Sequence, residues 1–235
     1  MSLGLDQPRL VLDQHEGRDD QNVKAVILTG GGEKAFVAGA DIKEMAAMDM
    51  SESEAFSLLL QGANNTLTRM KKVVIAAING HALGGGCELA MACDYRFMAA
   101  GKWLIGLPEA TLGIVPGAGG TQRLPRLVGL AKAMDILLRG RTMSPEEALE
   151  IGLVDRVFEA GNFMGEVMEF AHKLASGAGK ALGFIKAAVH EGLDLPMEQA
   201  LAVERKYGLD NLQTHDAKEG LTAFAEKRKP VFLNK

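Results

Sequence analysis

The stretch Asn79–Ala92, read as NGHALGGGCELAMA, combines the features best suited to chemistry in this sequence. Its three consecutive glycines, Gly84–Gly86, are unfavourable inside a helix or strand, because glycine loses the most backbone freedom on folding. The apolar run Val73–Ile78 before them predicts a buried strand, and Cys87–Ala92 after them predicts a helix. Unpaired backbone N–H groups at the start of such a helix can hold negative charge. Glu88 lies in the first turn, so one element combines a potential proton carrier with a potential anion site.

A second segment repeats this arrangement. Val23–Thr29 predicts a strand that ends at Gly30–Gly32. The small residues Ala38-Gly39-Ala40 then precede Asp41, a residue type favoured at the N-cap of a helix. The sequence therefore predicts a short helix after Asp41 and a second turn that can present backbone N–H groups.

Composition excludes several classes of partner. The chain has 235 residues and a formal net charge of −4, so it lacks the basic surface expected for nucleic-acid binding. No run of about eighteen apolar residues is present to span a bilayer, and we expect no membrane partner. The two cysteines, Cys87 and Cys93, are too few for a disulfide scaffold and indicate packing residues in a reducing, cytoplasmic compartment. The glycines of Leu112–Thr121 match neither a phosphate loop nor a dinucleotide fingerprint.

Strands and helices alternate through about residue 110, which favours an α/β fold with parallel strand pairing. Further strands are predicted at residues 94–100, 102–105 and 154–158, and further helices at residues 9–18, 122–128, 130–138 and from 145 onward. Beyond residue 161 only helices are predicted, at residues 162–175, 180–191, 196–208 and 214–227. We therefore expect a core at residues 1–160 and a helical oligomerisation region at residues 161–235.

The longest helix of the predicted core begins at Ser51, with Glu54 three residues later as the second half of a capping box. Apolar side chains recur along one face of this helix, which predicts that the face packs into the core. These side chains are Phe56, Leu59, Leu60, Ala63, Leu67 and Met70.

Four motifs together are specific, although each glycine-rich piece alone would be weak. They read VKAVILTGGGEKAFVAGADIKEM, NGHALGGGCELAMACD, GLPEATLGIVPGAGGTQRLPRLVG and SPEEALEIGLVDRV. With them the chain resembles the enoyl-CoA hydratase/isomerase family, also called the crotonase family, from roughly Val23 to the C-terminus. The resemblance implies an α/β fold in which a spiral of ββα turns precedes a C-terminal helical region. It also implies a homotrimer or a dimer of trimers.

The resemblance assigns roles to four positions. Glu88 and Glu109 match the two acids of the hydratase branch, where Glu88 would activate water and Glu109 would exchange the proton at the α carbon of the substrate. The backbone N–H groups of Ala40 and Gly85 match the oxyanion hole, which stabilises negative charge on the thioester oxygen. The substrate would be an acyl-CoA thioester, so coenzyme A is part of the substrate and not a cofactor. We expect no metal or redox cofactor.

The resemblance also places the substrate-binding segment. It matches Ala40, Asp41, Ile42, Lys43 and Gly85, with Lys43 available for a phosphate of coenzyme A. Since methionine adapts to apolar shapes, Met45, Met48 and Met50 are candidates to flank an acyl pocket. Members of the family usually begin with a strand hairpin and an Asn-Arg-Pro type segment, which this sequence lacks before Val23. We therefore expect an N-terminal hairpin segment to be missing.

Alternative readings remain open from the sequence. Glu88 could be an acid that only complements the helix dipole, whereas Glu109 follows Pro108 with no helical face to explain it. His81 is more typical of a packed histidine than of a base. The main expectation is hydration of 2-enoyl-CoA to 3-hydroxyacyl-CoA. The alternatives are an enoyl-CoA isomerase of the same fold, which needs one acid, and a noncatalytic acyl-CoA binding subunit.

Overall fold

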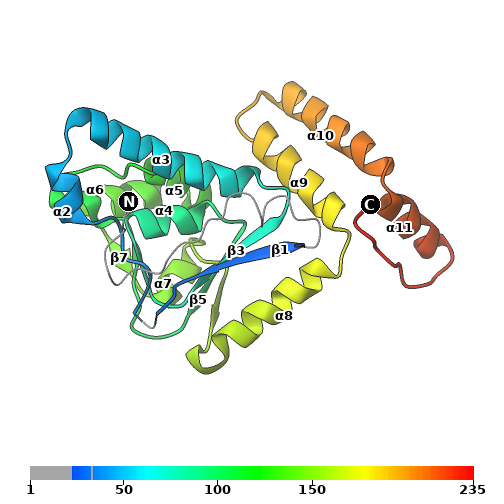
Figure 1. The fold of residues 1–235 in the computed structure, drawn as a ribbon, viewed down its shortest axis with the longest axis horizontal. Coiled ribbons are helices and arrows are strands. Elements are labelled where there is room, and N and C mark those ends of the chain that lie inside the picture. The colour runs from blue at the N-terminus through cyan, green and yellow to red at the C-terminus, as the bar shows by residue number, and fades with distance from the viewer. Residues whose placement is uncertain (1–22, 33) are drawn as a thin grey trace. The chain divides into compact units, whose positions relative to one another are not determined.

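The computed structural model describes residues 23–32 and 34–235, so the helix predicted at residues 9–18 lies outside the described residues (Figure 1). The fold is α/β, as predicted. In chain order the elements are β1 Ala25–Thr29, β2 Ala35–Val37, α2 Ile42–Ala47, α3 Met50–Arg69, β3 Val73–Ile78, β4 His81–Leu83, α4 Gly85–Met91, β5 Tyr95–Ala99, β6 Ile105–Gly106, the 3-10 helix η1 Pro108–Leu112, α5 Gly120–Val128, α6 Leu130–Arg139, β7 Thr142–Met143, α7 Pro145–Glu150, β8 Arg156–Phe158, the 3-10 helix η2 Ala160–Asn162, α8 Phe163–Ala175, α9 Gly179–Gly192, α10 Met197–Leu212 and α11 His215–Ala225.

The described residues form two compact units. The first contains residues 27–67 and 75–167, and the second contains residues 23–26, 68–74 and 168–235. The division predicted from the sequence, at residue 160, stays a prediction.

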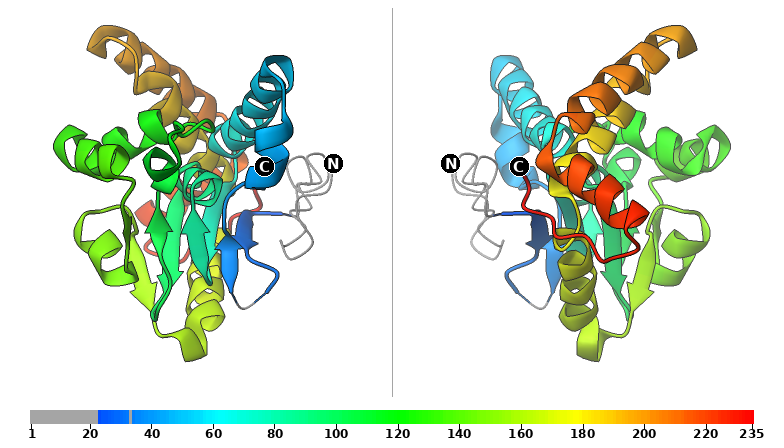
Figure 2. Two further views of the ribbon diagram at one scale, coloured as in Figure 1. Left: turned by 90° about the vertical axis from the view of Figure 1, so that its left-hand side faces the viewer. Right: turned by 90° about the vertical axis from the view of Figure 1, so that its right-hand side faces the viewer.

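Within the described residues the strands form two four-stranded sheets, in the orders β1-β3-β5-β8 and β2-β4-β6-β7. The strands β3, β5 and β8 run side by side in Figure 2, and both of their pairings are parallel. Every residue of β3 is buried, as its continuous apolar run predicts. In the second sheet β2–β4 and β4–β6 are also parallel, whereas β6–β7 is antiparallel. Parallel pairing is therefore confirmed, but the short strands β2, β4 and β7 were not predicted.

The second sheet positions three segments that follow its strands. In a parallel sheet the carboxyl ends of neighbouring strands lie at one edge. The strand β2 leads into the turn before α2, β4 leads through Gly84 into α4, and β6 leads through Leu107 into η1. The register pairs Leu83 with Gly106, and the backbone N–H of Gly84 donates to the carbonyl of Gly106 at 3.0 Å. The segments that carry Ala40, Glu88 and Glu109 are thereby brought to the same edge.

The second unit is mainly helical. The helices α9 and α10 lie side by side (Figure 1), and the hydroxyl of Tyr207 donates to Glu191 at 2.5 Å. In α11 the buried Asp216 accepts hydrogen bonds from the backbone N–H groups of Leu233 and Asn234, which fastens the C-terminal tail. Within residues 23–32 and 34–235, no helix combines the length and apolar character needed to cross a membrane.

The N-terminus of α3 differs from the prediction. The capping box is formed by Asp49 and Glu52 rather than by Ser51 and Glu54. The N–H of Glu52 donates to Asp49 Oδ1 at 2.8 Å, and the N–H of Asp49 donates to Glu52 Oε2 at 2.9 Å. Both pairs have the required spacing, but an acidic cap followed by an acidic third residue begins the helix two residues earlier.

The apolar face of α3 is only partly core, which corrects the prediction. Leu67 is fully buried and Met70 is 9% exposed, but Leu59 is 57% exposed. Phe56 and Leu60 instead line a cavity in the first unit. The helical period correctly groups these side chains on one face, but it does not distinguish a packed core from the wall of a cavity.

The observed cap predicts a difference between two neighbouring substitutions. Asp49→Ala should lower the free energy of unfolding by about 1 kcal/mol, because the N–H of Glu52 loses its acceptor. Ser51→Ala, in the same helical turn, should leave the stability unchanged within about 0.5 kcal/mol. Urea unfolding followed by circular dichroism measures both. Equal losses in the two variants would contradict the observed capping box.

Candidate active site

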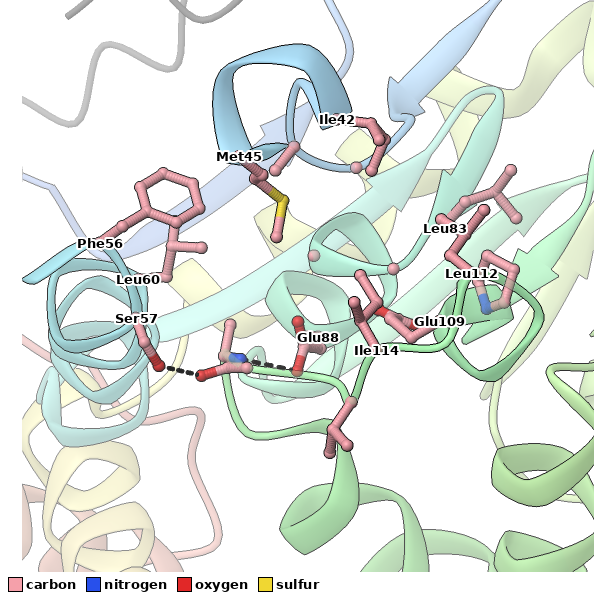
Figure 3. Close-up of a pocket in the computed structure, with 18 of the residues that line it drawn as sticks. Ile42, Met45, Phe56, Ser57, Leu60, Leu83, Glu88, Glu109, Leu112 and Ile114 are labelled. Atoms are coloured by element: carbon pink, nitrogen blue, oxygen red, sulfur yellow. Dashed lines mark hydrogen bonds between the residues drawn. The ribbon is translucent and has the colours of Figure 1, made fainter. Parts of the chain in front are cut away.

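A cavity of about 360 Å³ lies at the carboxyl ends of β2, β4 and β6 (Figure 3). Most of its described lining is apolar, and Glu88 and Glu109 are the only charged side chains among those residues. The side chains of Ile42, Met45 and Phe56 face it from α2 and α3. An apolar cavity with a few convergent polar groups is the usual form of a small-molecule site.

Glu88 is held by two backbone donors. It lies in the first turn of α4, and its side chain is buried, with 2% exposure for the residue. Its Oε1 accepts hydrogen bonds from the N–H of Ala118 at 2.8 Å and the N–H of Gly120 at 2.7 Å. Burial raises the pKa of Glu88 above its ordinary value, while the two backbone hydrogen bonds and the charge of Arg123 oppose this rise.

Glu109 has a different environment. It lies in the first turn of η1, is also buried, and its Oε2 has no hydrogen-bond partner among the described residues. Burial raises the pKa of Glu109 to about 6, and the nearby charge of Glu88 adds to the rise. The orphaned buried oxygen favours the protonated form, because an ionised carboxylate would lack compensation there. The two carboxyl groups in the cavity thus differ in the hydrogen-bond donors that contact them.

The turn into α4 requires glycine at two positions. Gly84 has φ = 54°, a conformation that other residues rarely adopt, and a Cβ there would lie 2.9 Å from Glu109 Oε1. A Cβ on Gly86 would lie 2.0 Å from the carbonyl oxygen of Val37 in β2. Any side chain at position 86 would therefore push α4 away from β2. Gly85, between them, lines the cavity.

The turn after β2 places the other predicted site residues. Ala40 and Ile42 line the cavity, as does Gly85. Asp41 does not line it and instead caps α2, where its Oδ1 accepts from the N–H groups of Lys43 and Glu44. The exposed Lys43 lies in the first turn of α2 and is not a lining residue. The predicted N-cap at Asp41 is confirmed.

The backbone N–H groups of Ala40 and Gly85 are available to a ligand. No residue in the described part of the chain accepts a hydrogen bond from either group. Both residues belong to the lining, Ala40 after β2 and Gly85 after β4. The cavity wall therefore contains two backbone donors without an acceptor among the described residues.

Cys87 and His81, near the site, have structural roles. Cys87 is fully buried, and burial raises the pKa of its thiol far above the usual range, so the predicted packing role fits. The Nδ1 of His81 accepts from the N–H of Leu104 at 3.1 Å, and its ring contacts Trp103 edge to face.

Of the three candidate pocket methionines, Met45 and Met48 line the cavity, whereas Met50 does not and is 85% exposed.

Sequence reasoning missed the groups that hold Glu88. The donors are backbone N–H groups of Ala118 and Gly120, which residue types cannot reveal. It also missed Ser57 of α3, which lines the cavity and contacts the loop before α5. The only available signal was the glycine-rich composition of Leu112–Thr121, which indicated a loop but not its partner.

Comparisons with known proteins all indicate the same family. The family model for enoyl-CoA hydratase/isomerase matches residues 11–235. The short-chain-enoyl-CoA hydratase of Clostridium acetobutylicum is 46% identical over 214 residues, covering 91% of this chain and 82% of that protein. The crotonyl-CoA hydratase of Syntrophomonas wolfei is 45% identical over 218 residues, covering 92% and 83%. The crystal structure of an enoyl-CoA hydratase from Bacillus anthracis has a TM-score of 0.88 at 41% identity, covering 94% of this chain and 85% of that one.

The raised pKa of Glu109 predicts a pH-dependent cost to stability. Between its ordinary value of 4.5 and the folded value of about 6, the unfolded chain releases the proton first. Stability from this group is therefore complete below pH 4.5 and is lost as the pH rises through 6. Glu109→Gln should be more stable relative to wild type at pH 8 than at pH 4.5, by on the order of 2 kcal/mol. Urea unfolding at both pH values measures the difference.

The matched control for this experiment is the exposed Glu150 of α7. Glu150→Gln removes a carboxyl group outside the cavity and measures the effect of the same substitution at the two pH values. An offset for Glu109→Gln that does not change between the two pH values would show that Glu109 ionises normally in the folded protein.

Proposed function

The chain belongs to the enoyl-CoA hydratase/isomerase family, and from this premise we propose that it adds water to 2-enoyl-CoA thioesters, giving 3-hydroxyacyl-CoA. The observation that carries the proposal is the pair of buried carboxyl groups, Glu88 and Glu109, on one apolar cavity. Relatives 45–46% identical over nine tenths of the chain are named for this reaction. The two-acid site favours hydration over isomerisation, which needs only one proton carrier.

The proposed mechanism uses the two acids in opposite protonation states. Glu88, whose Oε1 accepts two backbone hydrogen bonds, is the carboxylate that takes a proton from water. The water oxygen bonds to the β carbon, and the electron pair of the double bond moves toward the thioester carbonyl. Glu109, whose pKa is about 6, donates its proton to the α carbon. The cycle closes when Glu88 loses a proton and Glu109 regains one.

The negative charge that develops on the thioester oxygen needs donors. We assign this role to the backbone N–H groups of Ala40 and Gly85, which line the cavity and have no acceptor among the described residues. Each such donor is worth roughly 3–4 kcal/mol of the barrier in comparable sites. Because backbone donors are fixed by the fold, they need no reorganisation during the reaction.

Substrate binding follows from the same geometry. The apolar side chains of Met45, Phe56 and Leu60 suit an acyl chain. The exposed Lys43, with Asp41 and Ile42 beside Ala40, is assigned to the coenzyme A part, where its ammonium group would pair with a phosphate. The reaction transfers protons and a hydroxyl group only, so its chemistry requires no redox cofactor. A trimer or a dimer of trimers remains the proposed assembly.

The test is hydration of crotonyl-CoA, followed by loss of absorbance of the conjugated enoyl thioester. Wild type should turn over, and Glu88→Gln and Glu109→Gln should each lower kcat by about 10²–10⁴-fold, because each removes a proton carrier. Glu150→Gln, an exposed glutamate of α7 outside the cavity lining, should match wild type.

Three outcomes bear on the proposal, and the first and the third count against it. If wild type binds the thioester without changing the absorbance, hydration of this short substrate is excluded and the noncatalytic reading gains support. If Glu88→Gln abolishes hydration but retains double-bond isomerisation of a 3-enoyl-CoA, the site works with a single acid for the second reaction. Retained hydration in both variants would remove the two glutamates from the mechanism.

A further inference from the structure

Two side chains of α3 hold one carbonyl group in the loop before α5. The hydroxyl of Ser57 donates to the carbonyl oxygen of Gly117 at 2.7 Å, and Nε2 of Gln61 donates to the same oxygen at 2.8 Å. Gln61 Nε2 also donates to Ser57 Oγ at 3.2 Å, so the two side chains, one helical turn apart, support each other. Figure 3 shows the bond from Ser57 to this loop beside the bond from the loop to Glu88.

The carbonyl of Gly117 belongs to the same peptide group as the N–H of Ala118. That N–H donates to Glu88 Oε1 at 2.8 Å. Because a peptide group is planar, a hydrogen bond that fixes its oxygen also fixes the direction of its N–H. Donors on the oxygen also polarise the group and strengthen the hydrogen bond made by its N–H. The path from Ser57 and Gln61 to Glu88 therefore passes through a single rigid group.

We propose that Ser57 and Gln61 are positioning residues that orient Glu88 for proton transfer through the Gly117–Ala118 peptide group. The inference rests on the proposed function for its catalytic meaning. A second contact on the same helix, from Asn64 Nδ2 to the carbonyl of Ala118 at 2.9 Å, fixes the next peptide group of the loop. Asn64 is buried, whereas Gln61 is exposed, so Gln61 can be changed without opening the core.

The position of Gln61 separates this role from substrate contact. Gln61 is not among the residues that line the cavity, although Ser57 is. Charged or titratable groups that act electrostatically with Glu88 include Glu109 of η1, Arg123 of α5 and Cys87 of α4 itself. Neither Ser57 nor Gln61 adds a charge to this set. Their removal therefore changes hydrogen bonds near Glu88 without changing a charge.

The experiment compares Gln61→Leu and the double variant Ser57→Ala/Gln61→Leu with wild type. Weakening the Ala118 hydrogen bond disfavours the carboxylate, so the pKa of Glu88 should rise by about 0.5 to 1 pH unit. On the acid side of the pH profile kcat for crotonyl-CoA should then fall by about three- to tenfold. KM should stay unchanged in Gln61→Leu. In the free protein, ¹³C NMR of the labelled glutamate carboxyl groups, assigned with Glu88→Gln, measures the same shift directly.

Two further variants control for effects on the helix. Ser51→Ala removes a hydroxyl from the first turn of α3 and should leave both the titration and the kinetics unchanged. Ser57→Thr keeps the hydroxyl and should titrate like wild type, which a loss of packing alone would not explain. Circular dichroism confirms that each variant is folded.

The outcomes separate this inference from the proposed function. If wild type does not hydrate crotonyl-CoA, the proposed function fails, but the NMR titration still decides whether Ser57 and Gln61 act on Glu88. An unchanged Glu88 titration and an unchanged acid limb in the double variant would overturn the positioning role. A fall in kcat equal at every pH, without a shift in the titration, would also overturn it.

Discussion

The parallel register of β2, β4 and β6 is the constraint on which the rest of the site depends. These strands contain only two or three residues each, yet their carboxyl ends deliver Ala40, Glu88 and Glu109 to one edge. The close approach of α4 to β2, with no room for a Cβ on Gly86, sets the distance between two of these segments. A shift of one residue in the register would move a backbone donor by about 3.3 Å relative to the acids, because that is the rise per residue of a strand.

Glu88 and Glu109 have chemically identical side chains, but their surroundings differ. Both glutamates are buried, and burial raises the pKa of each. Glu88 has two backbone donors and the charge of Arg123 to offset that cost, whereas an oxygen of Glu109 has no partner within the described residues. The proposed mechanism uses this difference, with Glu88 accepting a proton and Glu109 retaining one.

Much of the fold could be predicted from the sequence because it depends on local patterns. The apolar run Val73–Ile78 and the cap at Asp41 are written in neighbouring residues. The strand β4 escaped prediction because three residues are too few to show a period, and its existence depends on partners at β2 and β6. The sequence analysis placed the cap of α3 two residues too late. Two overlapping pairs, Asp49 with Glu52 and Ser51 with Glu54, have the spacing of a capping box, and the spacing alone does not choose between them.

The candidate site also combines features that residue types indicate with features that depend on distant parts of the chain. Glycine-rich turns and the motif resemblance pointed to Glu88 and Glu109, but nothing in residue types indicated that the N–H of Ala118 would hold Glu88. The apolar period of α3 predicted a core helix. In the structure Phe56 of this helix lines the cavity, and Ser57 donates a hydrogen bond to the loop before α5. Polar residues between apolar ones are ordinarily read as solvated. Here they meet a backbone carbonyl some sixty positions away in the chain, and only the folded structure reveals that partner.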